Sequence, residues 1–136
     1  MDFDKLARKI LEGMPDALLV SDRGGNITFW NAGAERIFGF SEKEALGQSL
    51  DIITPERLRT RHWAGYNETM LSGKTKYGAG DLLSVPAIRK DGAQISVQFS
   101  ILPLHDDAGV LTEIAAIMRD VTADFEERRK LRRAAL

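Results

Sequence analysis

A strict alternation of apolar and polar side chains limits the fold of this chain more than any other feature of its sequence. The apolar positions are Ile95, Val97, Phe99 and Ile101, and Gln or Ser stands before each of them. Residues two apart project from the same face of a β-strand, so this pattern is typical of a strand with one buried face. The chain is therefore expected to contain a sheet that other elements cover on one side.

Turn signals join further strand segments to this one. Asp91-Gly92 lies between apolar runs, which is a strong hairpin signal and predicts a partner strand over residues 82–89. Another strand is expected over residues 111–119, after the turn at 105–109. Near the N-terminus, two apolar runs flank the Gly-rich turn at 22–26 and predict a second hairpin.

Short helices are expected after this first hairpin. Residues 32–37 suit a helix that Gly39 would end, with Asn31 as its N-cap. Ser41 and Glu44 stand three residues apart, as in a capping box, and predict another short helix.

The longest helical signal runs from Pro55 to about Ser72, with Gly73 past its end. Four residues recur at every fourth position on one face of this helix: Leu58, His62, Tyr66 and Met70. Two strands, several helices and three strands together predict an α+β fold, with helices on one face of an antiparallel sheet.

Composition excludes several classes of function. The 136 residues suit one domain, and a net charge of -1 gives no broad attraction to nucleic acid or to anionic membranes. No apolar run approaches the roughly 20 residues needed to cross a bilayer, so a cytoplasmic protein is expected. The chain has no cysteine, which excludes disulfides and thiol catalysis. It also has no phosphate loop, hydrolase or kinase motif set, and we expect no enzyme activity.

The order and spacing of three motifs resemble a PAS domain, the sensory module of bacterial signalling proteins. They are ALLVSDRGGNITFWNAGAERIFGFSEKEALGQ, Lys90-Asp91-Gly92 and Arg119-Asp120-Val121-Thr122. The resemblance implies a five-stranded antiparallel sheet with flanking N- and C-terminal helices. We expect an amphipathic helix over 1–13, the sensory domain over 14–122, and a signal-transmitting helix over 123–136 that is cut in mid-helix.

The long helix resembles its counterpart in the haem-binding PAS domains of rhizobial oxygen-sensor kinases. In those domains a histidine preceded by Arg-x-Arg binds the iron, and His62 follows Arg59-Thr60-Arg61 in the same way. The resemblance implies haem b as a cofactor, with His62 as its metal ligand. The pattern departs from those sensors at two places: Tyr66 comes one residue later, and Leu83 stands where a distal arginine is expected.

The same resemblance implies a cofactor pocket between the long helix and the sheet. Its expected lining is His62, Tyr66, Met70, Leu83, Phe99, Ile101, Ile114 and Met118. Haem, another small molecule and a core filled by side chains remain alternatives, whereas a flavin photoadduct is excluded because it needs a cysteine. His105 is expected on the surface. Three arginines precede His62, and they are expected either at haem propionates or in solvent: Arg57, Arg59 and Arg61.

Asp120 and Thr122 match a junction of PAS domains that links the last strand to an output helix. The resemblance implies a homodimer through the flanking helices and an output domain that is a kinase, a cyclic-dinucleotide enzyme or a DNA-binding domain. Two functions stay open: a ligand-gated sensor in a two-component or transcription-regulating protein, and a ligand-free dimerisation and signal-relay module.

Overall fold

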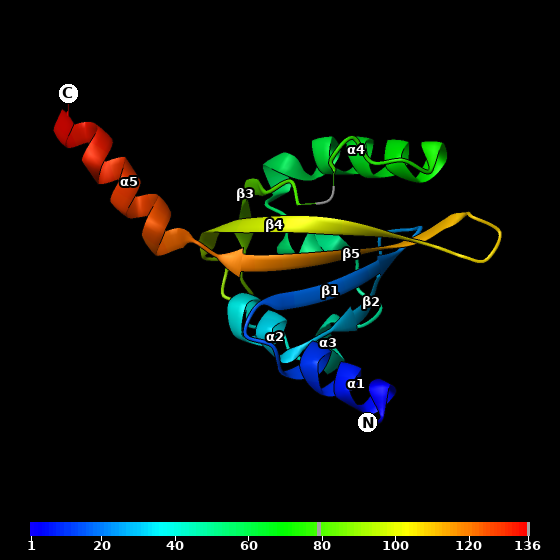
Figure 1. Cartoon of the computed structure of the whole chain (residues 1–136). Coiled ribbons are helices and arrows are strands. Elements are labelled where there is room, and N and C mark those ends of the chain that lie inside the picture. The colour runs from blue at the N-terminus through cyan, green and yellow to red at the C-terminus, as the bar shows by residue number, and fades with distance from the viewer. Residues whose placement is uncertain (79, 136) are drawn as a thin grey trace.

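A computed structural model, which describes residues 1–78 and 80–135, contains one five-stranded antiparallel sheet in the order β2-β1-β5-β4-β3 (Figure 1). The strands are β1 (Ala17–Asp22), β2 (Ile27–Trp30), β3 (Leu83–Ile88), β4 (Gln94–His105) and β5 (Leu111–Asp120). The helices are α1 (Phe3–Gly13), α2 (Ala32–Phe38), α3 (Glu42–Ala45), α4 (Arg59–Ser72) and α5 (Thr122–Ala135), with 3-10 turns η1 (Leu50–Ile53) and η2 (Glu56–Leu58).

The register of the strands places the apolar residues on a common inner face. Leu19 of β1 is opposite Ala116 of β5, and Phe99 of β4 is opposite both Met118 and Leu83. Side chains two apart on each strand therefore share this face. The alternation that begins at Ile95 is thus confirmed as the pattern of a strand with one covered side.

The core lies between this inner face and the helices that follow β2. Trp30 and Phe38 are almost fully buried, and their rings pack 5.6 Å apart. Gly39 ends α2 in the left-handed conformation, and Ser41 and Glu44 form the capping box of α3. These local elements are the ones that their sequence patterns predict.

The long helix differs at its beginning from the expected range of Pro55 to Ser72. Residues after Pro55 form the 3-10 turn η2, because the amide of Leu58 donates to the carbonyl of Pro55 three residues earlier. The α-helix begins at Arg59, whose guanidinium donates to the carbonyls of Thr54 and Asp51. These bonds hold the start of α4 against the preceding loop.

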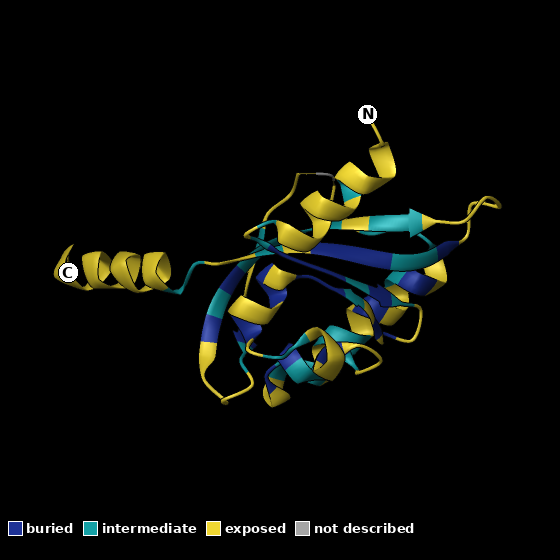
Figure 2. Ribbon diagram, turned by 90° about the horizontal axis from the view of Figure 1, so that it is seen from below, coloured by how far each residue is buried: buried dark blue, intermediate teal, exposed yellow. Residues whose placement is uncertain are grey.

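The two terminal helices bury none of their described residues completely (Figure 2). Apolar side chains of α1 such as Phe3 and Ile10 are exposed, and α5 projects away from the sheet (Figure 1). α5 begins at Thr122, one residue before the expected range of 123–136, and Leu136 lies outside the described residues.

A single buried amide side chain connects α1, β1 and α2. Asn31 is 2% exposed, and its Oδ1 accepts from the backbone amides of Leu18 and Ala34. Its Nδ2 donates to the carbonyls of Leu11 and Asp16. Asn31 is therefore the N-cap of α2, as predicted, and also fixes the chain entering β1.

We expect Asn31→Ala to lower the free energy of unfolding by about 2–4 kcal/mol, because buried amides at Leu18 and Ala34 lose their acceptor. Urea unfolding measures this loss. Asn67→Ala, at an exposed position of α4, is the matched control and should change stability by less than about 0.5 kcal/mol. Equal effects of the two substitutions would contradict this role of Asn31.

Candidate functional site

The candidate site begins with three aromatic rings on α4. The ring of His62 lies 4.7 Å from that of Trp63 and 5.8 Å from that of Tyr66, and the last two are 5.4 Å apart. Tyr66 and Met70 are the buried residues of the helix, and His62 lies on the same face one turn earlier. The spacing of four residues therefore predicted correctly which face of α4 is turned inward.

Tyr66 is bonded to the sheet through its hydroxyl group. Its Oη lies 2.9 Å from Ser21 Oγ and donates to the carbonyl of Asp22 at 2.5 Å. Burial raises the pKa of Tyr66, so its hydroxyl keeps its proton at neutral pH. Because a carbonyl can only accept, Tyr66 donates to Asp22 and Ser21 donates to Tyr66.

Trp63 fixes the same helix against the turn between β1 and β2. Its indole Nε1 donates to Asp51 Oδ1 at 2.8 Å. Its ring covers Gly25 so closely that a Cβ at this position would lie 2.1 Å from Trp63 Cη2. Gly25 also has a φ of 78°, so this turn requires glycine for two reasons.

His62 carries an unsatisfied polar atom inside the protein. Its Nδ1 is buried and has no hydrogen-bond partner among the described residues. Burial lowers the pKa of His62, and the nearby carboxylate of Asp51 opposes this shift. The imidazole is therefore neutral at pH 7, the form in which histidine binds a metal ion.

The other expected pocket residues are divided between the core and a less covered part of the inner face. Ile114 and Met70 are buried in the core. Leu83, Phe99, Ile101 and Met118 are only partly buried, and all four lie on the inner face by their register. Val85, which lies two residues after Leu83 on the edge strand β3 and was not predicted, is 39% exposed on the same face.

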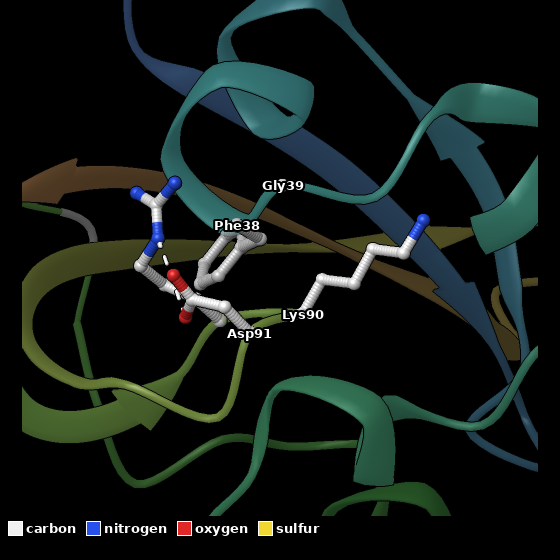
Figure 3. Close-up of a pocket in the computed structure, with 5 residues that line it drawn as sticks. Phe38, Gly39, Lys90 and Asp91 are labelled. Carbon is white, nitrogen blue, oxygen red and sulfur yellow. Dashed lines mark ion pairs between the residues drawn. The ribbon is translucent and has the colours of Figure 1, made fainter.

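A surface hollow lies away from this face (Figure 3). It measures about 410 Å³ and is bounded by Phe38, Gly39, Arg89, Lys90 and Asp91. Its charges already have partners: Arg89 donates to the carbonyl of Ile37, and Lys90 pairs with Glu44 at 2.5 Å. The hydrogen bond from Lys90 lowers the pKa of Glu44 to about 2. The charged side chains that bound this hollow therefore already have partners among the described residues, and none of them indicates a bound ligand.

The donor set at His62 fits haem as far as ligation is concerned. A buried neutral imidazole with an unpaired ring nitrogen is a suitable iron ligand, and the partly buried face of Phe99 and Ile101 is apolar. Leu83 offers no hydrogen-bond donor. Across residues 1–78 and 80–135, no three acidic or histidine side chains form a metal-binding group, so a bare metal ion has no comparable site.

The arginines before His62 were expected either at haem propionates or in solvent, and the structure places them differently from one another. The guanidinium of Arg59 donates hydrogen bonds to the carbonyls of Thr54 and Asp51. Arg57 and Arg61 are exposed. His105 is exposed as well, as predicted, at the end of β4. Ser21, Trp63 and Asp51 were not predicted, because only the folded chain brings them to α4.

The junction residues Asp120 and Thr122 form a compact hydrogen-bonded turn. Asp120 Oδ1 accepts from the amide and the hydroxyl of Thr122. Thr122 Oγ1 in turn accepts from the amide of Ser96 on β4, and the amide of Val121 donates to the carbonyl of Ser96. The start of α5 is thus bonded to the fourth strand as well as continuous with the fifth.

Fold and sequence together define the class of this protein. The family model of the PAS domain matches residues 15–123, so the chain belongs to the PAS domain family. It is a sensory domain of the kind found in signalling proteins. A crystal structure of a PAS domain from Colwellia psychrerythraea superposes with a TM-score of 0.75 at 21% identity, covering 90% of this chain and 99% of that one.

Among characterised relatives, the chain is 32% identical over 124 residues to the sensor protein FixL of Bradyrhizobium diazoefficiens. It is 23% identical over 121 residues to the oxygen sensor protein DosP of Escherichia coli. These matches cover 91% and 89% of the chain but only 24% and 15% of the two relatives. In the described ranges, no helix has the length and apolar character needed to cross a membrane.

We expect Tyr66→Phe to lower the free energy of unfolding by about 1–3 kcal/mol, because it leaves the buried hydroxyl of Ser21 unpaired. Urea unfolding of Tyr66→Phe, Ser21→Ala and the double variant forms the cycle that measures the pair. The double variant should be less destabilised than the sum of the single variants. Strict additivity would show that the two hydroxyls are not coupled.

The stability of the domain should fall with acid through His62. The folded state keeps His62 neutral below its ordinary pKa of 6.5, while the unfolded chain takes up a proton there. The stability that comes from keeping His62 neutral is fully present above pH 6.5, the ordinary pKa of the unfolded chain. It is lost as the pH falls from there through the lowered pKa of the folded state. Urea midpoints between about pH 8 and about pH 5 measure the slope.

His62→Leu should reduce this slope, whereas His105→Gln, at an exposed position, should retain it. An unchanged slope in His62→Leu would assign the acid sensitivity to other groups.

Proposed function

We propose that this chain is a ligand-binding sensory PAS domain whose site lies between α4 and the inner face of the sheet, with His62 in contact with the ligand. The observation that carries the proposal is that Nδ1 of His62 is buried and has no hydrogen-bond partner in the part of the chain that the structure describes. An unsatisfied buried polar atom costs free energy, and such atoms are retained where they serve a function or bind an absent group. The oxygen sensor among the relatives supports a sensory role for the domain.

Haem is the ligand that we propose first. His62 would hold the iron, and the partly buried side chains of Phe99, Ile101 and Met118 would lie against an apolar ring. Haem would supply an iron centre that binds a diatomic gas or changes its redox state. The chain itself would provide the neutral imidazole and a wall that excludes water, with Leu83 giving that wall no charged donor.

The signal would leave the domain through the sheet and α5. Met118 lies on the inner face two residues before Asp120, whose carboxylate fixes the start of α5. A ligand that shifts Met118 would thereby shift the bonds that join Thr122 to Ser96. In a longer cytoplasmic protein, α5 would lead to a kinase, cyclic-dinucleotide enzyme or DNA-binding domain, and the exposed apolar face of α1 would join two copies.

A ligand-free relay module is the second candidate, and the position of Tyr66 favours it. The ring of Tyr66 already occupies the space between α4 and β1, and its hydroxyl is bonded to Ser21. In that case His62 would be a packing residue, and dimerisation through the flanking helices would carry the signal.

An absorption spectrum of the chain expressed with haem supplied separates the two candidates. We expect a Soret band in the native chain and its loss in His62→Ala, because the side chain that ligates the iron is removed. His105→Ala removes an exposed histidine and is the matched control, so its spectrum should equal that of the native chain.

The absence of a band in the native chain would exclude haem and favour the relay module or another ligand. A band that persists in His62→Ala would show that the iron is held elsewhere.

A further inference from the structure

The chain enters β1 and leaves β5 at the same end of the sheet. β1 and β5 are antiparallel neighbours, and Ala17 at the beginning of β1 is opposite Met118 near the end of β5. The segment that follows α1 therefore lies beside the segment that precedes α5. Figure 1 shows α5 continuing from the arrowhead of β5.

An ion pair connects these two segments. Arg119 Nε donates to Asp16 Oδ1 at 3.3 Å, and Arg119 Nη2 donates to Asp16 Oδ2 at 3.1 Å. Two parallel bonds between a guanidinium and a carboxylate fix direction as well as distance. We call this contact the Asp16–Arg119 clasp. Its partners are 103 positions apart in the chain.

Asp16 is the rigid side of the clasp. Its carbonyl accepts from Nδ2 of the buried Asn31, which also holds the carbonyl of Leu11 at the end of α1. Gly33 lies so close that a Cβ there would be 2.1 Å from this carbonyl. The backbone of Asp16 is therefore held by the same side chain that holds α1. The side chain of Asp16 is 26% exposed.

Arg119, the other partner, lies near the end of β5, and α5 begins three residues later at Thr122. None of the described residues of α5 is buried, and polar bonds to Ser96 hold its first residues. An exposed ion pair contributes little to the stability of a whole domain. The pair acts on α5 only through Asp120 and Val121, the two residues that join Arg119 to the helix.

We propose that the Asp16–Arg119 clasp sets the direction of α5 relative to α1, so that a movement of β5 reorients both terminal helices together. The inference rests on the proposed function in one respect only: it takes α5 as the helix through which the signal leaves the domain. The relative direction of the helices can be measured without any ligand, so a failure to bind haem would not affect the test.

The test is a distance measurement by double electron–electron resonance between nitroxide labels on α1 and α5. The chain has no cysteine, so Lys9→Cys and Lys130→Cys place labels at two exposed positions only. Dilution with unlabelled chain removes distances between copies. In Asp16→Arg and in Arg119→Asp, we expect the ratio of native to displaced helix populations to fall about two- to fivefold.

The charge swap, Asp16→Arg with Arg119→Asp, should return the distribution toward that of the native chain. Glu12→Arg breaks an ion pair of 3.2 Å that lies within α1 and is the matched control, with no change expected. The neutral variants Asp16→Asn and Arg119→Gln repeat the test if a reversed charge prevents folding. High salt should broaden the native distribution, because it screens an exposed pair.

Native distributions in all single variants would overturn the proposal. So would a charge swap that behaves like the single variants, because the effect would then not come from the pair.

Discussion

Pairing between the first and fifth strands is the constraint on which the rest of this domain depends. β1 and β2 form one hairpin, and β3, β4 and β5 form a separate meander, so only the β1–β5 ladder makes them a single sheet. Its register sets Leu19 opposite Ala116 and thereby aligns the inner faces of both parts. The same ladder brings the chain after α1 beside the chain before α5.

Polar bonds, more than apolar contact, hold α4 over this sheet. Only Tyr66 and Met70 are buried on the helix, but hydrogen bonds attach it at several points. Tyr66 is bonded to Ser21 and Asp22, and Arg23 donates both to the carbonyl of Met70 near the end of the helix and to that of Leu111 on β5. Bonds of this kind are directional and therefore fix the position of α4 over the sheet.

The candidate site therefore lies between two walls of different kinds, the strands of the sheet and α4. The sheet supplies apolar side chains whose positions are fixed by the ladders. The helix supplies His62, whose unpaired nitrogen makes this part of the core energetically incomplete. Under the proposed function, a ligand would pair with His62, and the rings of Trp63 and Tyr66 lie next to it.

The sequence by itself determined the local elements of this protein: the alternating strand from Ile95, the Asp-Gly hairpin, the capping box at Ser41, the cap at Asn31 and the inward face of α4. These features depend on neighbours within a few residues, and their motifs also identified the family. The 3-10 turn after Pro55 was not predicted, because Arg59 stabilises it by folding back onto the preceding loop. Only the tertiary structure decided that Ser21 meets Tyr66, that Asp51 meets Trp63, and that Asp16 meets Arg119. The physical reason is that side-chain hydrogen bonds and ion pairs require atoms about 3 Å apart, and residues distant in sequence reach that separation only when the chain has folded.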